Sequence, residues 1–65
     1  MEKIEYFERL RRVKEVLPKY YGVIVRSKHP NVKATTLYNV VDKDVYNVTV
    51  LLAMEDTFKD QLITQ

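Results

Sequence analysis

The sequence predicts an all-α protein, a small bundle of about four helices. Apolar residues recur at helical spacing near both ends of the chain, and two prolines and a polar cluster at residues 42–44 separate the segments. The β-branched residues that could form a strand have no partner segment to pair with. A chain of 65 residues supports one core only, so we expect a single domain over residues 1–65.

The first helix is predicted from Glu2 to Leu17. The segment is rich in strong helix formers, and it ends before Pro18 because proline breaks the backbone hydrogen-bond pattern. Its apolar residues form one stripe, which consists of Tyr6, Phe7, Leu10, Val13 and Leu17. Charged residues four positions apart can pair on the other face, namely Glu5 with Arg9 and Glu8 with Arg12. We therefore interpret that face as solvated.

The second helix is predicted from Tyr20 to His29. Three consecutive β-branched residues, 23–25, would also fit a strand, but pairing that strand would disturb the helical pattern elsewhere in the chain. Pro30 and Asn31 are expected to form a turn, because the residue before proline avoids helical geometry. Gly22 fits a helix whose backbone packs closely on a neighbour.

The third helix is predicted from Val32 to Val41, with the polar cluster 42–44 as its stop. The residues of one side are expected to pack on the core, and they are Thr36, Leu37, Val40 and Val41. The residues of the other side are small or polar, with one phenol, and they are Ala34, Thr35, Tyr38 and Asn39. This outer face is unusual for a helix that is only solvated.

The last helix is predicted from about residue 48 to about residue 61, with Asn47 as its N-terminal cap. Its inner face is expected to hold Val48, Leu51, Leu52, Phe58 and Leu62, and its outer face Glu55, Asp56, Lys59 and Asp60. The predicted core of the whole domain is Phe7, Leu10, Leu17, Ile24, Leu37, Val40, Leu51, Leu52 and Phe58.

Composition argues against several classes of function. The chain has no cysteine, and His29 is its single histidine, so we expect no metal site, no cofactor and no enzymatic activity. The longest apolar run is far shorter than the ~20 residues that a membrane span needs. We therefore expect a soluble protein without a membrane partner, located in the cytoplasm, near a nucleoid or in an infected host cell.

Positive charge is concentrated in the middle of the chain. Residues 18–45 carry five basic and two acidic side chains, a balance of +3, whereas residues 46–65 carry one basic and three acidic side chains, a balance of −2. The basic side chains expected to hold DNA phosphates are Arg26, Lys28, Lys33 and Lys43. The residues expected to read bases in the major groove are Ala34, Thr35, Tyr38 and Asn39, since Asn pairs with adenine and Thr contacts the thymine methyl group.

Residues 17–56 resemble the phage-repressor-like helix-turn-helix domains of the lambda repressor and Cro type. Thr36 to Val40 match the core of that family's reading helix, and Asn47 with residues 50–53 match the start of its closing helix. The resemblance implies a helix-turn-helix at about residues 20–42 and a small, repressor-like transcriptional regulator that binds double-stranded DNA.

Both turns depart from the family pattern. The family usually places glycine in the first turn and Asn-Gly after the reading helix, where this chain has residues 29–31 and 42–43. The first turn is also about two residues longer than the family's. A left-handed backbone at these places would fall to Asn31, which tolerates it, or to Lys43, which adopts it at some cost.

Two other modes of action remain open. The helix-turn-helix scaffold could serve as a protein-binding module instead of a DNA-binding domain. The surface around Tyr20, Tyr21, Tyr38 and Tyr46 discriminates between these two functions. Basic residues around Tyr38 favour DNA, and an apolar tyrosine patch away from Arg26 and Lys33 favours a protein partner. Single-stranded RNA stacking on the tyrosines is a weaker alternative, because it usually needs a sheet platform.

A homodimer is also expected, through an interface of Phe58, Leu62 and Ile63 near the C-terminus. A monomer would leave Leu62, Ile63 and part of Phe58 in water, and a two-fold axis would place two reading helices on an inverted repeat. The alternative is that these C-terminal residues fray, as chain ends usually do.

Overall fold

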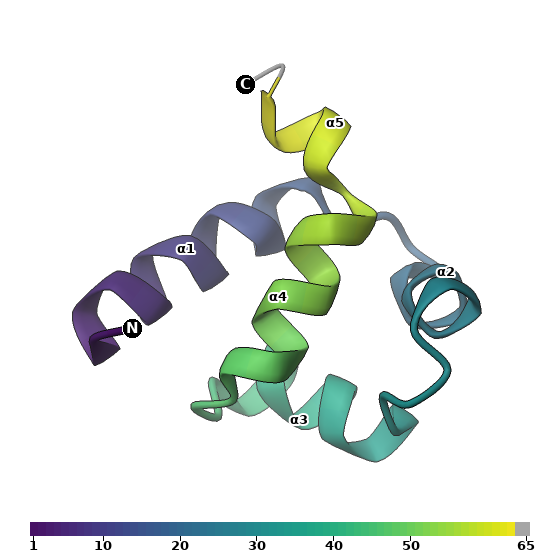
Figure 1. The fold of residues 1–65 in the computed structure, drawn as a ribbon, viewed down its shortest axis with the longest axis horizontal. Coiled ribbons are helices and arrows are strands. Elements are labelled where there is room, and N and C mark those ends of the chain that lie inside the picture. The colour runs from purple at the N-terminus through teal and green to yellow at the C-terminus, as the bar shows by residue number, and fades with distance from the viewer. Residues whose placement is uncertain (64–65) are drawn as a thin grey trace.

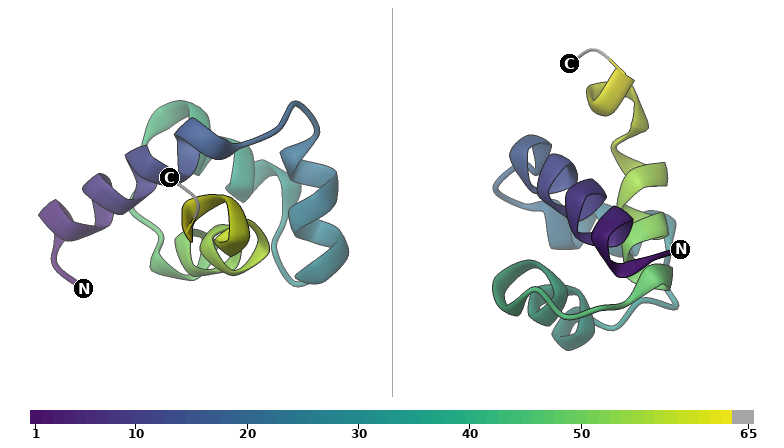
Figure 2. Two further views of the ribbon diagram at one scale, coloured as in Figure 1. Left: turned by 90° about the horizontal axis from the view of Figure 1, so that it is seen from above. Right: turned by 90° about the vertical axis from the view of Figure 1, so that its left-hand side faces the viewer.

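Figure 1 shows the five helices of the computed structural model, which describes residues 1–63. They are α1 Lys3–Val16, α2 Tyr21–Lys28, α3 Ala34–Lys43, α4 Val48–Thr57 and α5 Lys59–Ile63. Helix α4 packs against α1, α2, α3 and α5, so it is the centre of the bundle. Two further views show α1 and α3 on the same side of α4 (Figure 2). The prediction of a small all-α bundle is confirmed.

Helix α1 ends at Val16, one residue earlier than predicted, and Pro18 is the cause of the stop, as expected. Leu17 has an extended backbone, with φ −67° and ψ 126°, as proline requires of the residue before it. The Pro18 carbonyl then accepts a hydrogen bond of 3.2 Å from the Tyr21 backbone N–H, which starts α2 close behind α1. Because this connection is short, α2 lies next to the C-terminal end of α1 (Figure 1).

The stop after α3 is a left-handed residue, but it is neither Asn31 nor Lys43. Asp44 adopts φ 53° and ψ 43°, and it is the one non-glycine residue with positive φ in residues 1–63. Asp tolerates this conformation better than Lys, because its short polar side chain can bond locally. The Asp44 carboxylate accepts a contact of 3.0 Å from the Lys14 ammonium, which fixes the end of α3 against α1.

The segment between α3 and α4 is held by the hydroxyl of Tyr6. This buried side chain of α1 donates a hydrogen bond of 2.6 Å to the Val45 carbonyl and accepts one of 2.9 Å from the Asn47 N–H. The Asn47 side chain in turn accepts a hydrogen bond of 3.2 Å from the Val50 N–H, so its predicted role as the N-terminal cap of α4 is confirmed.

The predicted last helix is divided into two, which raises the number of helices to five. Phe58 has φ −113° and ψ 26° and lies between α4 and α5. One residue earlier, the Thr57 hydroxyl donates a hydrogen bond of 2.7 Å to the Ala53 carbonyl, a contact that bends helices. The break lets the Phe58 ring enter the core while residues 59–61 stay exposed.

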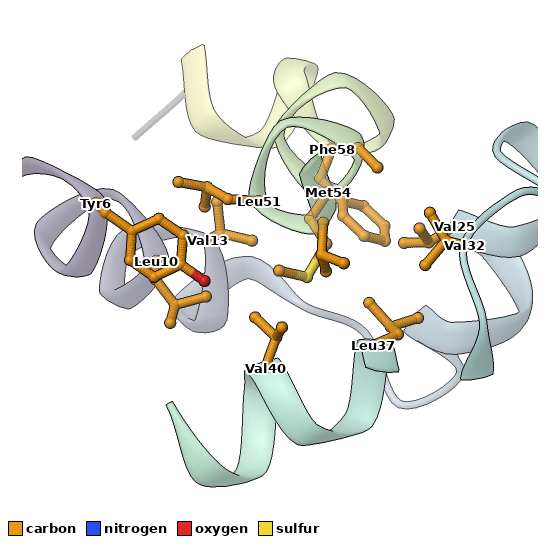
Figure 3. Packing of buried hydrophobic residues seen from close by; sticks show 12 residues of the cluster. Tyr6, Leu10, Val13, Val25, Val32, Leu37, Val40, Leu51, Met54 and Phe58 are labelled. Atoms are coloured by element: carbon orange, nitrogen blue, oxygen red, sulfur yellow. The ribbon is translucent and has the colours of Figure 1, made fainter. Parts of the chain in front are cut away.

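Five of the nine predicted core residues are fully buried, and they are Leu10, Leu37, Val40, Leu51 and Phe58. Leu17 packs on the core from its edge. The prediction is wrong for Phe7, Ile24 and Leu52, which are 38%, 42% and 48% exposed. Their places are taken by neighbours in the sequence, namely Tyr6, Val25 and the pair Leu51 and Met54 (Figure 3). Val13, Val32, Val50 and Ala53 complete the core.

Arg9 does not pair with Glu5 as the helical spacing suggests. Its guanidinium instead makes two contacts with the Glu55 carboxylate of α4, one of them a hydrogen bond of 2.8 Å from Nε to Oε2. This bidentate contact raises the pKa of Arg9 above its ordinary value. Glu55, predicted to face water, therefore ties α4 to α1.

Candidate nucleic-acid interface

Helices α2 and α3 are joined by a five-residue turn, 29–33, that is anchored in the core. The His29 N–H donates 2.8 Å to the Val25 carbonyl, and the Val32 N–H donates 3.1 Å to the His29 carbonyl. Val32 is buried, so the turn is fixed by one apolar side chain in its middle. The prediction that Val32 opens the third helix is wrong, because α3 begins at Ala34 and continues to Lys43.

Tyr38 of α3 lies across the backbone of α2. A Cβ atom built on Gly22 would stand 2.5 Å from the Tyr38 hydroxyl oxygen and 3.0 Å from its ring. The Tyr38 ring also meets the Tyr21 ring edge to face, with 5.7 Å between centroids. The predicted close approach at Gly22 is confirmed, and the neighbour is this tyrosine. Tyr38 is thus a structural contact between the two helices, although 43% of it remains exposed.

The four residues predicted to read bases differ in exposure. Thr35 is exposed in the first turn of α3, and Tyr38 is exposed beside it. Ala34 and Asn39 are only half-exposed, at the two edges of the outer face. The inner face is as predicted, since Leu37 and Val40 point from α3 into the core (Figure 3).

The four predicted phosphate contacts are all exposed, and they are Arg26, Lys28, Lys33 and Lys43. None of them forms an ion pair within residues 1–63. By contrast, Arg9 and Lys14 are held by carboxylates of other elements. Lys28 and Lys33 stand at the two ends of the turn before α3, so free positive charge flanks the N-terminal end of that helix.

An acidic residue, Asp42, shares the outer face of α3, which the sequence reading did not take into account. It follows Tyr38 by four positions and Thr35 by seven, so helical geometry aligns the three. The pKa of Tyr21 is raised mainly by burial, and also by the negative charge of Asp42. The C-terminal half of this face is therefore acidic, and the N-terminal half is neutral with basic flanks. The i, i+4 and i+7 spacing was the signal that could have revealed it.

His29 is tied to the closing helix. Its Nε2 atom lies 3.1 Å from the Asp56 carboxylate, so this ring links the end of α2 to α4. Residues 1–63 contain no group of three or more His, Asp or Glu side chains that could hold a metal ion. None of the helices described is long and apolar enough to cross a membrane.

The predicted C-terminal interface loses one of its three members. Phe58 is 3% exposed within a single chain, so the expectation that a monomer leaves it in water is wrong. Leu62 packs on the edge of the core, and Ile63 is 78% exposed. Only one of these apolar side chains is thus freely available to a partner.

The tyrosines separate into two groups. Tyr21 and Tyr38 lie in α2 and α3, the helices that also carry Arg26, Lys28 and Lys43, and their rings contact each other. Tyr46 contacts the Tyr6 ring at 4.6 Å between centroids, on the side of α1. That side also carries a groove of about 780 Å³, whose apolar lining is Ile4, Phe7 and Leu10. The molecule therefore has two distinct candidate surfaces.

Comparisons with family models, curated proteins and solved structures give no match to this chain. The fold and the site alone define it as a small five-helix protein that presents one helix, α3, beside free basic side chains.

The Gly22 contact predicts a displacement of the Tyr38 ring with little effect on stability. In Gly22→Ala, the new Cβ displaces the Tyr38 ring and disturbs its contact with Tyr21. The loss of about 0.5–1.5 kcal/mol from the ring contact is offset by the gain of about 1 kcal/mol in helix propensity. We expect a melting temperature close to the parent's and a changed environment of Tyr38 by NMR. A Tyr38 spectrum identical to the parent's would contradict the close approach.

Proposed function

We propose that this chain binds double-stranded DNA sequence-specifically, with α3 in the major groove, and acts as a small repressor-like regulator of transcription in the cytoplasm of a cell. The observation that carries the proposal is the outer face of α3. Thr35 and Tyr38 are exposed there. The four free basic side chains of the middle segment lie on α2, on α3 and in the turn between these two helices. The resemblance of residues 17–56 to the lambda repressor and Cro type supports the same role.

The attachment of α3 to its scaffold also supports the proposal. Leu37 and Val40 are buried beneath it, and Tyr38 locks it to α2 at Gly22. A reading helix has to keep its side chains in place, because base contacts depend on hydrogen-bond geometry. The exposed polar side chains of α3 thus stand on a fixed helix.

The charge along α3 sets the direction of docking in this proposal. Lys33 at the N-terminal end attracts phosphates, whereas Asp42 near the C-terminal end repels them. The N-terminal turn with Thr35 therefore approaches the bases, and the Asp42 side of the C-terminal end turns away from the phosphates, which leaves Lys43 as the phosphate contact at that end. N-terminal residues of the reading helix make the base contacts in known helix-turn-helix complexes.

Selection from random duplexes, followed by titration of variants, tests the base-reading residues. We expect Thr35→Ala and Asn39→Ala each to cost ~1–3 kcal/mol at the selected site and to relax base preference there. Thr49→Ala is the matched control, since Thr49 is also the exposed second residue of its helix but lies on α4. The assignment fails if Thr35→Ala and Asn39→Ala bind the selected site as tightly as the control.

Salt dependence tests the phosphate contacts separately. Lys33→Ala should weaken binding to all duplexes alike and make the slope of log K against log salt shallower by about one unit. Lys59→Ala is the control of equal charge, because Lys59 is exposed on α5. Equal slopes for the two variants would remove Lys33 from the interface.

A protein-binding module is the second candidate, and a specific observation favours it. Helix α2 and its N-cap residue carry three exposed apolar side chains, Tyr20, Val23 and Ile24, which are 67%, 68% and 42% exposed. Apolar side chains grouped in this way are typical of protein contacts. This candidate gains if no duplex is enriched in the selection, and it loses if a sequence-specific site emerges.

A further inference from the structure

We propose that the exposed face of α1 is a homodimer interface, in which α1 of one copy packs antiparallel on α1 of a second copy. The proposal does not rest on DNA binding. It starts from the groove along α1, where Ile4 is 75% and Phe7 38% exposed although both are large and apolar. Such side chains gathered over a groove of about 780 Å³ mark a contact surface.

One row of side chains dominates this face. Lys3, Phe7, Arg11 and Glu15 follow each other at intervals of four residues, and all four are exposed. Residues spaced by four form a ridge on the surface of a helix, inclined to its axis. Ridges of this kind pack into the grooves of a neighbouring helix in the commonest class of helix pairing. The row from Lys3 to Glu15 spans twelve residues, about 18 Å.

The order of chemical types along the ridge identifies the occupant as a second copy of this chain. Basic Lys3 and acidic Glu15 stand at equal distances from residue 9, and so do Phe7 and Arg11. A two-fold axis that crosses the exposed face of α1 between Phe7 and Arg11, at the height of residue 9, therefore brings each Lys3 to the Glu15 of the other copy, and each Phe7 to the other Arg11. The first pair is an ion pair, and the second is a cation–π contact. A single ridge that complements itself is what a two-fold interface requires.

The charges of the groove support the same occupant. Its lining holds three basic and three acidic side chains, which are Lys3, Arg11, Lys14, Glu8, Glu15 and Asp44. Of these, Lys14 and Asp44 neutralise each other within one chain. Arg11 and Glu15 form no ion pair within residues 1–63, so their charges are available to a partner. A strongly acidic or basic ligand would meet as much repulsion as attraction here.

The area of the exposed face of α1 determines how tightly we expect the dimer to bind. A standard interface buries about 800 Å² per partner, and the whole chain exposes 4562 Å². The ridge of one fourteen-residue helix covers less than the standard area. We therefore expect a weak dimer, with a dissociation constant on the order of 10–100 µM.

Sedimentation equilibrium of the full chain from about 10 µM to about 500 µM tests the surface. Ile4→Glu should raise the dissociation constant at least ~tenfold, because it places a charge in the apolar contact. Ile63→Glu is the matched control, since Ile63 is 78% exposed at the opposite end of the chain, and it should leave dimerisation unchanged. A parent that stays monomeric over the whole range, or a dimer lost in Ile63→Glu and kept in Ile4→Glu, overturns the proposal.

A charge swap tests the antiparallel register. Lys3→Glu alone and Glu15→Lys alone each place like charges together twice per dimer, and each should weaken it about threefold to tenfold. The double variant restores both ion pairs and should return the dissociation constant to within about twofold of the parent's. All three variants change exposed residues, and circular dichroism checks that each keeps the parent's helicity. A double variant weaker than both single variants would overturn the antiparallel pairing.

Discussion

Val40→Asp is expected to unfold the protein at neutral pH. Val40 is fully buried on the inner face of α3, and the side chains labelled on α4 and α1 are apolar except for the hydroxyl of Tyr6, which is bonded to Val45 and Asn47 (Figure 3). The core contains no buried polar or charged residue in the described chain, so an Asp carboxylate at this position would meet no partner. An unpaired buried charge costs several kcal/mol, and a domain of this size is stable by only about 3–5 kcal/mol.

Far-ultraviolet circular dichroism measures this effect as a loss of helical signal at 25 °C. Val23→Asp is the matched control, because Val23 lies in α2 with 68% of its surface exposed. This control should keep the helical signal and lose at most about 1 kcal/mol of stability. A Val40→Asp variant with the helicity and melting temperature of Val23→Asp would show that α3 does not pack on the core in this register.

The helices and their ends could be predicted where a local signal fixes them. Pro18 ends α1 because its ring excludes a helical residue before it, and Asn47 starts α4 because its side chain caps the first turn. The inner face of α3 was also predictable. Polar residues separate Leu37 from Val40, so only one face of this helix is apolar enough to pack on the core. In these places neighbouring residues carry all the necessary information.

The buried face of a helix could not be predicted where several apolar residues follow one another in the sequence. In α2, residues 23–25 are all β-branched and apolar, so their pattern cannot select the buried one. The structure buries Val25 because Gly22, three positions earlier, is the point at which α2 meets Tyr38. The apolar run 50–54 is ambiguous in the same way, and in the structure Leu52 is exposed while the residues around it are buried.

The exposed face of α3 was predicted in its position and less well in its details. The exposure of Thr35 and of the four cations follows from their polarity and spacing. The half-burial of Asn39 and the contact of Arg9 with Glu55 depend on elements distant in the sequence, and periodicity contains no information about them. The place of Asp42 on the outer face could have been predicted from its spacing from Thr35 and Tyr38, but the predicted helix ended at Val41 and left Asp42 out.

Tyr6→Phe is expected to lower stability by about 1–3 kcal/mol, which corresponds to a fall of roughly 5–20 °C in melting temperature for a domain this small. The Tyr6 hydroxyl satisfies the Val45 carbonyl and the Asn47 N–H across 39 and 41 residues of chain. Phenylalanine keeps the ring in the core and leaves both backbone groups without this partner. The effect thus measures how strongly one hydroxyl fixes the segment between α3 and α4.

Tyr46→Phe is the matched control, because the Tyr46 hydroxyl also donates to a backbone carbonyl, that of Met1, but at an exposed position. Water replaces that bond at little cost, so the control should lose less than about 1 kcal/mol. Equal melting temperatures for the two variants would mean that the Tyr6 hydroxyl does not hold the segment.

Alkaline pH should reduce the difference between the parent and Tyr6→Phe. Burial is the main cause that raises the pKa of Tyr6 above the ordinary tyrosine value of 10.0. The unfolded chain therefore loses the Tyr6 proton at lower pH than the folded chain does. The stabilisation by neutral Tyr6 is fully present below pH 10 and is lost as pH rises through the folded pKa. Tyr21, whose pKa is also raised by burial, is present in both proteins, so its contribution cancels. Urea unfolding of both proteins at pH 8 and above pH 10 should show the gap narrowing, and a constant gap would contradict the burial of the hydroxyl.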